Sequence, residues 1–163
     1  MKAHKFWGEV EEDWAGFSAA NTFSIPHFEQ QQVTVFLGEE FDEEGDEIDT
    51  PPDREELDAY EATFSSFIDQ LDHIIIEIKE QSFRRYQKLY AHYYEDEAKS
   101  GQPPLNINTP GKHFQHLKEI NYIRVLPNQT IQIPIRYGID TEHGLEIRLE
   151  NNSITAMAGI AET

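Results

Sequence analysis

A stretch of about 45 residues without proline or glycine, 53–97, constrains the fold of this chain more than any other feature. Its apolar residues recur at gaps of three and four, which places them on one face of a helix. This stripe consists of Leu57, Tyr60, Phe64, Phe67, Leu71, Ile74, Ile75, Ile78, Phe83, Tyr86, Leu89, Tyr90, Tyr93 and Tyr94. We therefore expect helix almost throughout, beginning after Pro51-Pro52 with carboxylates in the first turn, where they favour the helix dipole.

The length of this stretch predicts a break within it. One continuous helix would be about 67 Å long, at about 1.5 Å per residue. A domain of this size is only about 40 Å across. The sequence favours a break at 80–83, where the apolar stripe skips Ser82. The two resulting helices would then pack as a hairpin or at an angle.

The segments on either side of the helical stretch read as strands. Residues 4–37 predict three or four short antiparallel strands, with glycines and Asn21 at turns. Residues 105–118 are ambiguous, with one possible helical turn at 113–117. Alternating apolar and polar residues then predict a four-strand antiparallel meander at 122–126, 130–137, 145–150 and 153–157. Asn151-Asn152 suits a tight hairpin with positive φ.

These elements together predict an α+β fold in a single domain, 1–163. In it, an antiparallel sheet of N-terminal strands and the C-terminal meander packs against a long, broken helical segment. The meander should have one apolar face, covered by the helices, and one polar face.

The net charge of −18 is unevenly distributed along the chain. Residues 1–78 contain 21 acidic and three basic residues, whereas residues 79–163 contain ten of each. A surface of this kind repels nucleic-acid phosphates and anionic membranes, so neither is expected as a partner. Any partner it attracts should be a basic protein. Solubility alone is the alternative explanation of the charge.

Composition also limits the classes of site and location. The chain has no cysteine, which excludes disulfides, thiolate metal sites and cysteine catalysis. No apolar run approaches the roughly 18 residues that span a bilayer, and Met1–Val10 lacks the apolar core of a signal peptide. We expect a soluble cytoplasmic protein. Phosphate-binding glycine loops, dinucleotide motifs and nucleophile elbows are missing, so no cofactor is expected.

The most acidic part of the chain is a loop from Gly38 to Pro52. Its candidate partner-binding residues are Glu39, Glu40, Asp42, Glu43 and Glu44. A calcium loop with Gly45 at its sixth position would put Glu47 at the apolar eighth position and Pro51 at the glutamate twelfth. The pattern fails at both positions, and a solvated, self-repelling loop is expected instead.

A second, alternative site combines Glu142 and His143 with Tyr90 and Tyr94 of the tyrosine stripe. Buried tyrosine hydroxyls need polar partners, so the stripe can line a ligand groove, although core packing is its ordinary role. The seven histidines show no ligand spacing such as H-E-x-x-H, and no metal site is predicted.

Residues 140–147, with the sequence D-T-E-H-G-L-E-I, resemble the closing strand of a family of uncharacterised bacterial domains. The family pattern is roughly W-D-x-E-H-G-L-G-V. Ile139 replaces the tryptophan and Glu146 replaces the second glycine. The helix start at Thr50-Pro51 and the Tyr93-Tyr94 pair are also similar to this family. The resemblance implies an α+β cytoplasmic domain without an assigned activity, of a kind sometimes associated with toxin–immunity loci.

The leading hypothesis is a non-catalytic interaction protein, and specifically an immunity-type inhibitor. It would present its acidic half to a basic partner such as a nuclease toxin. The alternative is a small enzyme or ligand-binding domain that uses Glu142, His143 and the tyrosine stripe. An enzyme needs convergent polar groups with shifted pKa values in a pocket, whereas an interaction protein does not.

Overall fold

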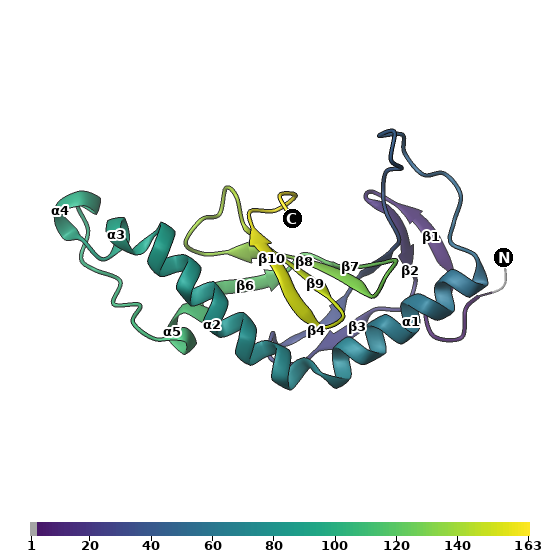
Figure 1. Cartoon of the computed structure of the whole chain (residues 1–163), viewed down its shortest axis with the longest axis horizontal. Coiled ribbons are helices and arrows are strands. Elements are labelled where there is room, and N and C mark those ends of the chain that lie inside the picture. The colour runs from purple at the N-terminus through teal and green to yellow at the C-terminus, as the bar shows by residue number, and fades with distance from the viewer. Residues whose placement is uncertain (1–2) are drawn as a thin grey trace.

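The computed structural model describes residues 3–163, and its architecture is α+β (Figure 1). The strands are β1 (Val10–Asp13), β2 (Gly16–Ala19), β3 (Phe23–Ile25), β4 (Gln30–Val33), β5 (Val35–Leu37), β6 (Leu117–Ile120), β7 (Ile123–Leu126), β8 (Thr130–Tyr137), β9 (Leu145–Glu150) and β10 (Ser153–Ala158). The helices are α1 (Arg54–Asp69), α2 (Leu71–Leu89), α3 (Ala91–Tyr94), α4 (Glu97–Ser100) and α5 (Pro110–Phe114). Among the described residues, no helix combines the length and apolarity needed to cross a bilayer.

One mixed sheet joins both ends of the chain, in the order β1-β2-β5-β7-β8-β9-β10, with β6 also paired to β8. Its pairs are antiparallel except for β5 and β7, which are parallel. The exception follows from connectivity, because all of the helices lie between these two strands and parallel neighbours need such a crossover. β3 and β4 form a separate two-stranded sheet.

The predicted C-terminal meander is confirmed, and its turns have the expected chemistry. Asn151 and Asn152 join β9 to β10 with φ of 51° and 65°. The turn between β7 and β8 has the same left-handed geometry at Asn128 and Gln129. Two successive residues with positive φ match the right-handed twist of the flanking strands, which favours asparagine there. Both turns therefore fix the strand register.

The predicted break in the long helix is real, but its predicted position at 80–83 is wrong. The helix breaks at Gln70, between α1 and α2, where φ is −96° and ψ is 3°. α1 and α2 have 16 and 19 residues, or about 24 and 28 Å, which suits a domain of this size. Ser82 misled the prediction because it is polar yet buried, with its hydroxyl 3.2 Å from His113 Nδ1. The stripe continues through it without a shift.

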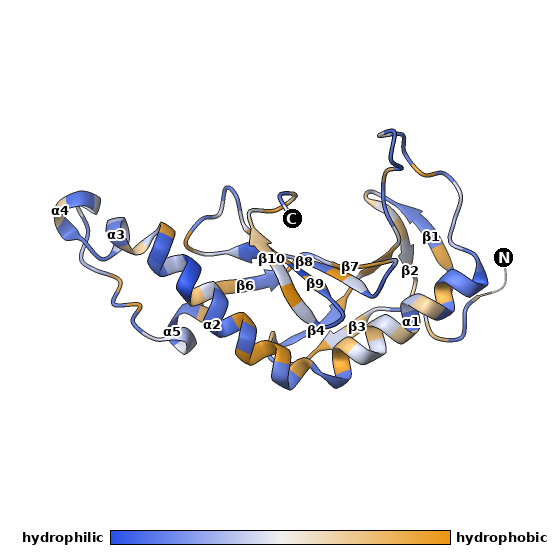
Figure 2. Ribbon diagram, viewed as in Figure 1, coloured by the Kyte–Doolittle hydropathy of each residue, from blue (hydrophilic) through white to orange (hydrophobic). Residues whose placement is uncertain are grey.

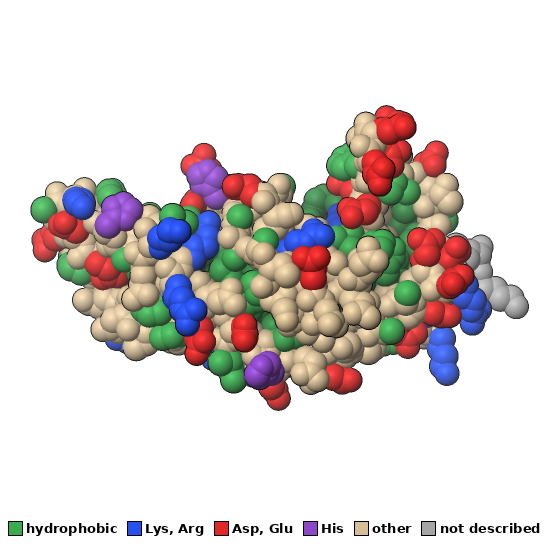
Figure 3. Space-filling view, in the orientation of Figure 1, with side chains coloured by type: hydrophobic (Ala, Val, Ile, Leu, Met, Phe, Trp, Pro, Cys, Tyr) green, Lys and Arg blue, Asp and Glu red, His purple; other side chains and the backbone are tan. Residues whose placement is uncertain are grey.

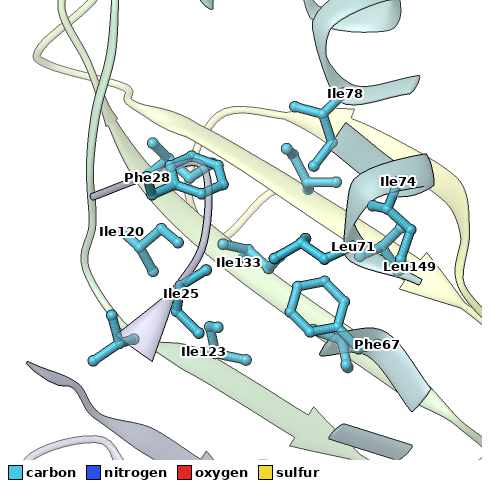
Figure 4. Packing of buried hydrophobic residues seen from close by; sticks show 14 of the residues in the cluster. Ile25, Phe28, Phe67, Leu71, Ile74, Ile78, Ile120, Ile123, Ile133 and Leu149 are labelled. Carbon is cyan, nitrogen blue, oxygen red and sulfur yellow. The ribbon is translucent and has the colours of Figure 1, made fainter. Parts of the chain in front are cut away.

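The core lies between the sheet and the two long helices (Figure 2). Leu71 of α2 and Ile133 of β8 are at its centre, with Ile25 and Phe28 closing one side (Figure 4). These residues are all less than 9% exposed, and they belong to one cluster that includes residues of β7, β8 and β9, while partly buried apolar residues of β10 pack against it. The predicted packing of helices on the apolar face of the meander is confirmed.

The opposite face of the sheet is less polar than the sequence suggested. All four residues of β7, including Arg124, are buried. The C-terminal residues fold over β9, where Ala161 N–H and the Thr163 hydroxyl donate to the Glu146 carboxylate. Long-range contacts that a strand pattern does not encode therefore cover part of this face.

The ambiguous segment 105–118 contains two short elements. The helical turn expected at 113–117 lies slightly earlier, as α5, with Thr109 as its N-cap and Pro110 in its first turn. Leu117–Ile120 is a strand, β6, that the sequence analysis missed. Its pairing with β8 is irregular between Leu117 and Ile120, so it lacks a clean alternating pattern.

Candidate functional site

The acidic loop, residues 38–52, is an arm that projects away from the long helices (Figure 1). Phe41 and Glu47 form an isolated β-bridge across it. The Ile48 N–H also donates to the Glu40 carbonyl at 3.0 Å. The five carboxylates singled out from the sequence therefore share one small hairpin, with Glu40 half-buried and the other four exposed.

The carboxylate of Asp42 organises the tip of this loop. Its Oδ1 accepts hydrogen bonds from the N–H groups of Glu44 and Asp46, both at 2.9 Å. The Gly45 N–H closes the same turn onto the Asp42 carbonyl. This is an Asx-type turn, in which a side-chain oxygen replaces a backbone acceptor.

Arg124 fixes the root of the acidic loop from inside the sheet. Its side chain is buried, and its guanidinium donates to the Gly38 carbonyl at 2.9 Å and to the Ala15 carbonyl at 2.7 Å. The guanidinium also lies against the rings of Phe36 and Tyr122, at 5.1 and 5.5 Å from their centroids. One cation therefore ties the start of the loop to the β1–β2 turn.

Two exposed aromatic side chains lie in the same acidic region as the carboxylates of the loop. Trp14, in the β1–β2 turn, is 73% exposed, and Phe41, in the acidic loop, is 53% exposed. Neither residue is among the candidate site residues expected from the sequence. The available signal was their context, because each is an aromatic residue in an acidic turn instead of a periodic apolar stripe.

Most of the alternative site comes together around Asp140, which the sequence placed in a motif but not among the candidate site residues. Asp140 Oδ2 accepts the Tyr90 hydroxyl at 2.8 Å, and both of its carboxylate oxygens lie 3.0 Å from His143 Nδ1. The Tyr94 hydroxyl donates to the Ile139 carbonyl at 3.2 Å. Tyr90, Tyr94 and His143 are thus brought to the β8–β9 loop, and Asp140 connects two of them.

Hydrogen bonding shifts the pKa values in this group. Burial alone would raise the pKa of Asp140, but hydrogen bonds from the His143 N–H, Tyr90 and the His143 ring lower it. The same bond to Asp140 raises the pKa of His143. Burial, followed by the bond to Asp140, raises the pKa of Tyr90. The carboxylate thus stays ionised and holds Nδ1 of His143 protonated, which directs Nε2 outward.

A shallow hollow of about 500 Å³ lies beside the Asp140–His143 pair. Its lining includes His143, Glu142, Arg136 and Glu162. Glu142 thus shares the hollow with His143, as the sequence analysis supposed, whereas Tyr90 and Tyr94 do not line it. The mixture of charges and the open shape suit a small polar ligand better than an apolar one.

A third cluster brings His4, Asp58 and Glu61 within 4.8 Å of one another. In metal sites such an arrangement needs a free imidazole lone pair. Here His4 Nδ1 accepts the N–H groups of Phe6 and Trp7, so its proton is on Nε2, which donates to Asp58 at 2.7 Å. His4 therefore ties the N-terminal turn to α1 and is not arranged as a metal ligand.

Comparison with known proteins adds a family. Residues 6–162 match the family described as a domain of unknown function (DUF6985). The chain belongs to the DUF6985 family. No curated protein matches it, and no solved structure does. The family match covers nearly the whole chain but supplies no activity.

A Ser–His contact in this DUF6985 domain resembles a catalytic pair but is closed to any substrate. His113 is 0% exposed and Ser82 is 1% exposed. His113 Nε2 lies 2.6 Å from the Tyr137 hydroxyl, while Nδ1 meets Ser82. Burial, and then the nearby charges of His116 and Arg85, lower the pKa of His113 to about 4. The pair is a neutral bridge between α2, α5 and β8.

This bridge predicts a loss of stability in acid. Below its unfolded pKa of about 6.5, His113 binds a proton in the unfolded chain but not in the folded domain. Unfolding is therefore favoured as the pH falls from about 6.5 towards 4, and the loss between pH 7.5 and 5 is about 2 kcal/mol. Urea titrations at these two pH values measure the free energy of unfolding. Its loss between them should be about 2 kcal/mol smaller in His113→Gln than in the parent. Equal losses in both proteins would contradict a neutral, buried His113.

Proposed function

We propose that this domain is a non-catalytic interaction protein that binds a basic protein partner through its acidic half, residues 1–78. The observation that carries the proposal is the segregation of charge. The entire excess of −18 lies in that half, while the remainder of the chain is neutral. Acidic side chains gather over the acidic loop and the start of α1, and basic side chains lie over α2 (Figure 3).

Solubility does not require this segregation. A net charge distributed over the whole surface keeps a domain soluble equally well. A one-sided field, in contrast, orients a charged partner during diffusion and raises its association rate. The β-bridge across the acidic loop and its attachment through Arg124 keep the carboxylates together, which favours recognition over simple repulsion.

The specific form of interaction protein that we propose is an immunity-type inhibitor of a basic toxin. Its support is the likeness of residues 140–147 to bacterial domains associated with toxin–immunity loci. A nuclease toxin needs a cationic surface to bind its phosphate substrate, and an acidic protein that covers this surface blocks the substrate by charge as well as by shape. A cytoplasmic location belongs to the same proposal.

Capture from the cells that contain this protein tests the proposal. The immobilised domain at low salt should retain a basic protein. A domain in which Glu39, Glu40, Asp42, Glu43 and Glu44 are changed to their amides should not retain it. Retention of only acidic or neutral proteins, or equal retention by both domains, would contradict the proposal.

One observation favours a second candidate function, the binding of a small polar ligand beside His143. Asp140 orients His143 with Nε2 towards solvent at the hollow that also contains Glu142 and Arg136. A fragment screen followed by NMR should find ligands that move the ring signals of His143, and Asp140→Asn should abolish that response. A screen in which no fragment reaches His143 would remove this candidate.

A further inference from the structure

Trp14 is an exposed tryptophan whose ring contacts two other aromatic side chains. Its indole meets the rings of Phe36 and Tyr122 edge-on, each at 5.5 Å between centroids. Its backbone N–H donates to its neighbour Asp13 at 2.8 Å. Despite these contacts it is 73% exposed, while Phe36 beneath it is fully buried. Most of the indole therefore does nothing for the fold.

The surroundings of Trp14 join it to the acidic loop. Arg124 holds the carbonyl of Ala15, next to Trp14, and the carbonyl of Gly38 at the root of the loop. A β-carbon on Gly16 would lie 3.7 Å from Glu40 Cα, so the tryptophan turn and the loop are in direct contact. Figure 3 shows the molecular surface hollowed beside the acidic arm.

We propose that Trp14 is the anchor of the partner interface and that the partner covers its indole with arginine or lysine side chains. The inference rests on the proposed function and specifies its contact chemistry. Tryptophan and arginine dominate the energetics of protein interfaces, and a cation over an indole face is attracted by the ring quadrupole. Asp13, next to Trp14, and Glu40, in the adjoining loop, add negative potential to this surface.

An apolar partner segment would fit this surface less well. Within the described part of the acidic half, the exposed large apolar side chains close to the carboxylates are Trp14 and Phe41. Two aromatic side chains surrounded by acidic residues offer little continuous apolar area. The acidic side chains around them instead match a cationic segment.

The test uses a ten-residue peptide of alternating arginine and serine. The control is the same peptide with each arginine replaced by uncharged citrulline. The protein has two tryptophans, and Trp7 is 0% exposed. Acrylamide quenching therefore reports on Trp14. We expect the arginine peptide to bind and to protect the indole from acrylamide, and the citrulline peptide to do neither. Trp14→Ala should weaken peptide binding about tenfold, and Trp14→Phe about threefold.

Ile76→Ala is the matched control, because Ile76 is an exposed apolar residue (54%) on α2. It should leave peptide affinity unchanged. If the wild-type domain binds the arginine peptide but Trp14→Ala binds it equally, or if bound peptide leaves quenching unchanged, the anchor is wrong while the proposed function stands. If the wild-type domain binds no arginine peptide at low salt, both the anchor and the acidic docking face are contradicted.

Discussion

Replacing Ile133 by Asp is expected to unfold the domain. Ile133 is 0% exposed on β8, pairs with Ile147 of β9, and lies against Leu71 of α2 (Figure 4). An aspartate there would bury a carboxylate without a partner. That change costs several kcal/mol, and the whole stability of a domain is only about 5–15 kcal/mol.

The control for this change is Ile76→Asp, which makes the same substitution where α2 faces solvent. Ile76 is 54% exposed, although its neighbour Ile75 is buried. Circular dichroism should show the Ile76 variant melting near the parent and the Ile133 variant largely unfolded or insoluble. A soluble Ile133→Asp protein that melts within about 2 °C of the parent would refute the packing of the helices on the meander.

The sequence predicts the parts of the fold that depend on local pattern. The strict alternation of Ile131, Ile133 and Ile135 gave β8, and Asn151-Asn152 gave the last hairpin. The parallel pairing of β5 and β7 was not foreseen, because it depends on where the crossover returns the chain. The helix break at Gln70 carries no glycine or proline, so tertiary packing sets its position.

The same limit applies to the candidate sites. The acidic loop is visible in composition, and His143 and Tyr90 were selected from short patterns. Asp140, which joins them, was matched in the sequence only as part of a motif. The exposure of Trp14 was indicated only by its place in an acidic turn, because aromatic residues between short strands are usually buried. The buried ring beneath it is that of Phe36.

Neutralising Glu39, Glu40, Asp42, Glu43 and Glu44 together is expected to slow association with a basic partner at least tenfold. Electrostatic steering raises association rates by about 10–10³, and these residues supply five of the carboxylates on the acidic arm. The fold should survive, because none of the five side chains is buried. Asp42→Asn keeps an oxygen that can accept the two N–H groups of the loop turn.

A matched control removes the same number of carboxylates from the other half of the chain. Glu80, Glu97, Glu119, Glu150 and Glu162 are all exposed, and all lie beyond residue 78. Changing them to Gln alters the net charge equally but leaves the acidic half intact. If position matters, this variant should associate at close to the parental rate, whereas a dependence on net charge alone would slow both variants alike.

The most direct measurement is the stopped-flow association rate of the captured basic partner as a function of salt. The Debye length falls from about 10 Å at 0.1 M to about 3 Å at 1 M. If the acidic half is the docking face, the parental rate should fall steeply over this range. The rate of the loop variant should already be low and should change little with salt. A parental rate that is indifferent both to salt and to loss of the five carboxylates would show that the charge serves solubility alone.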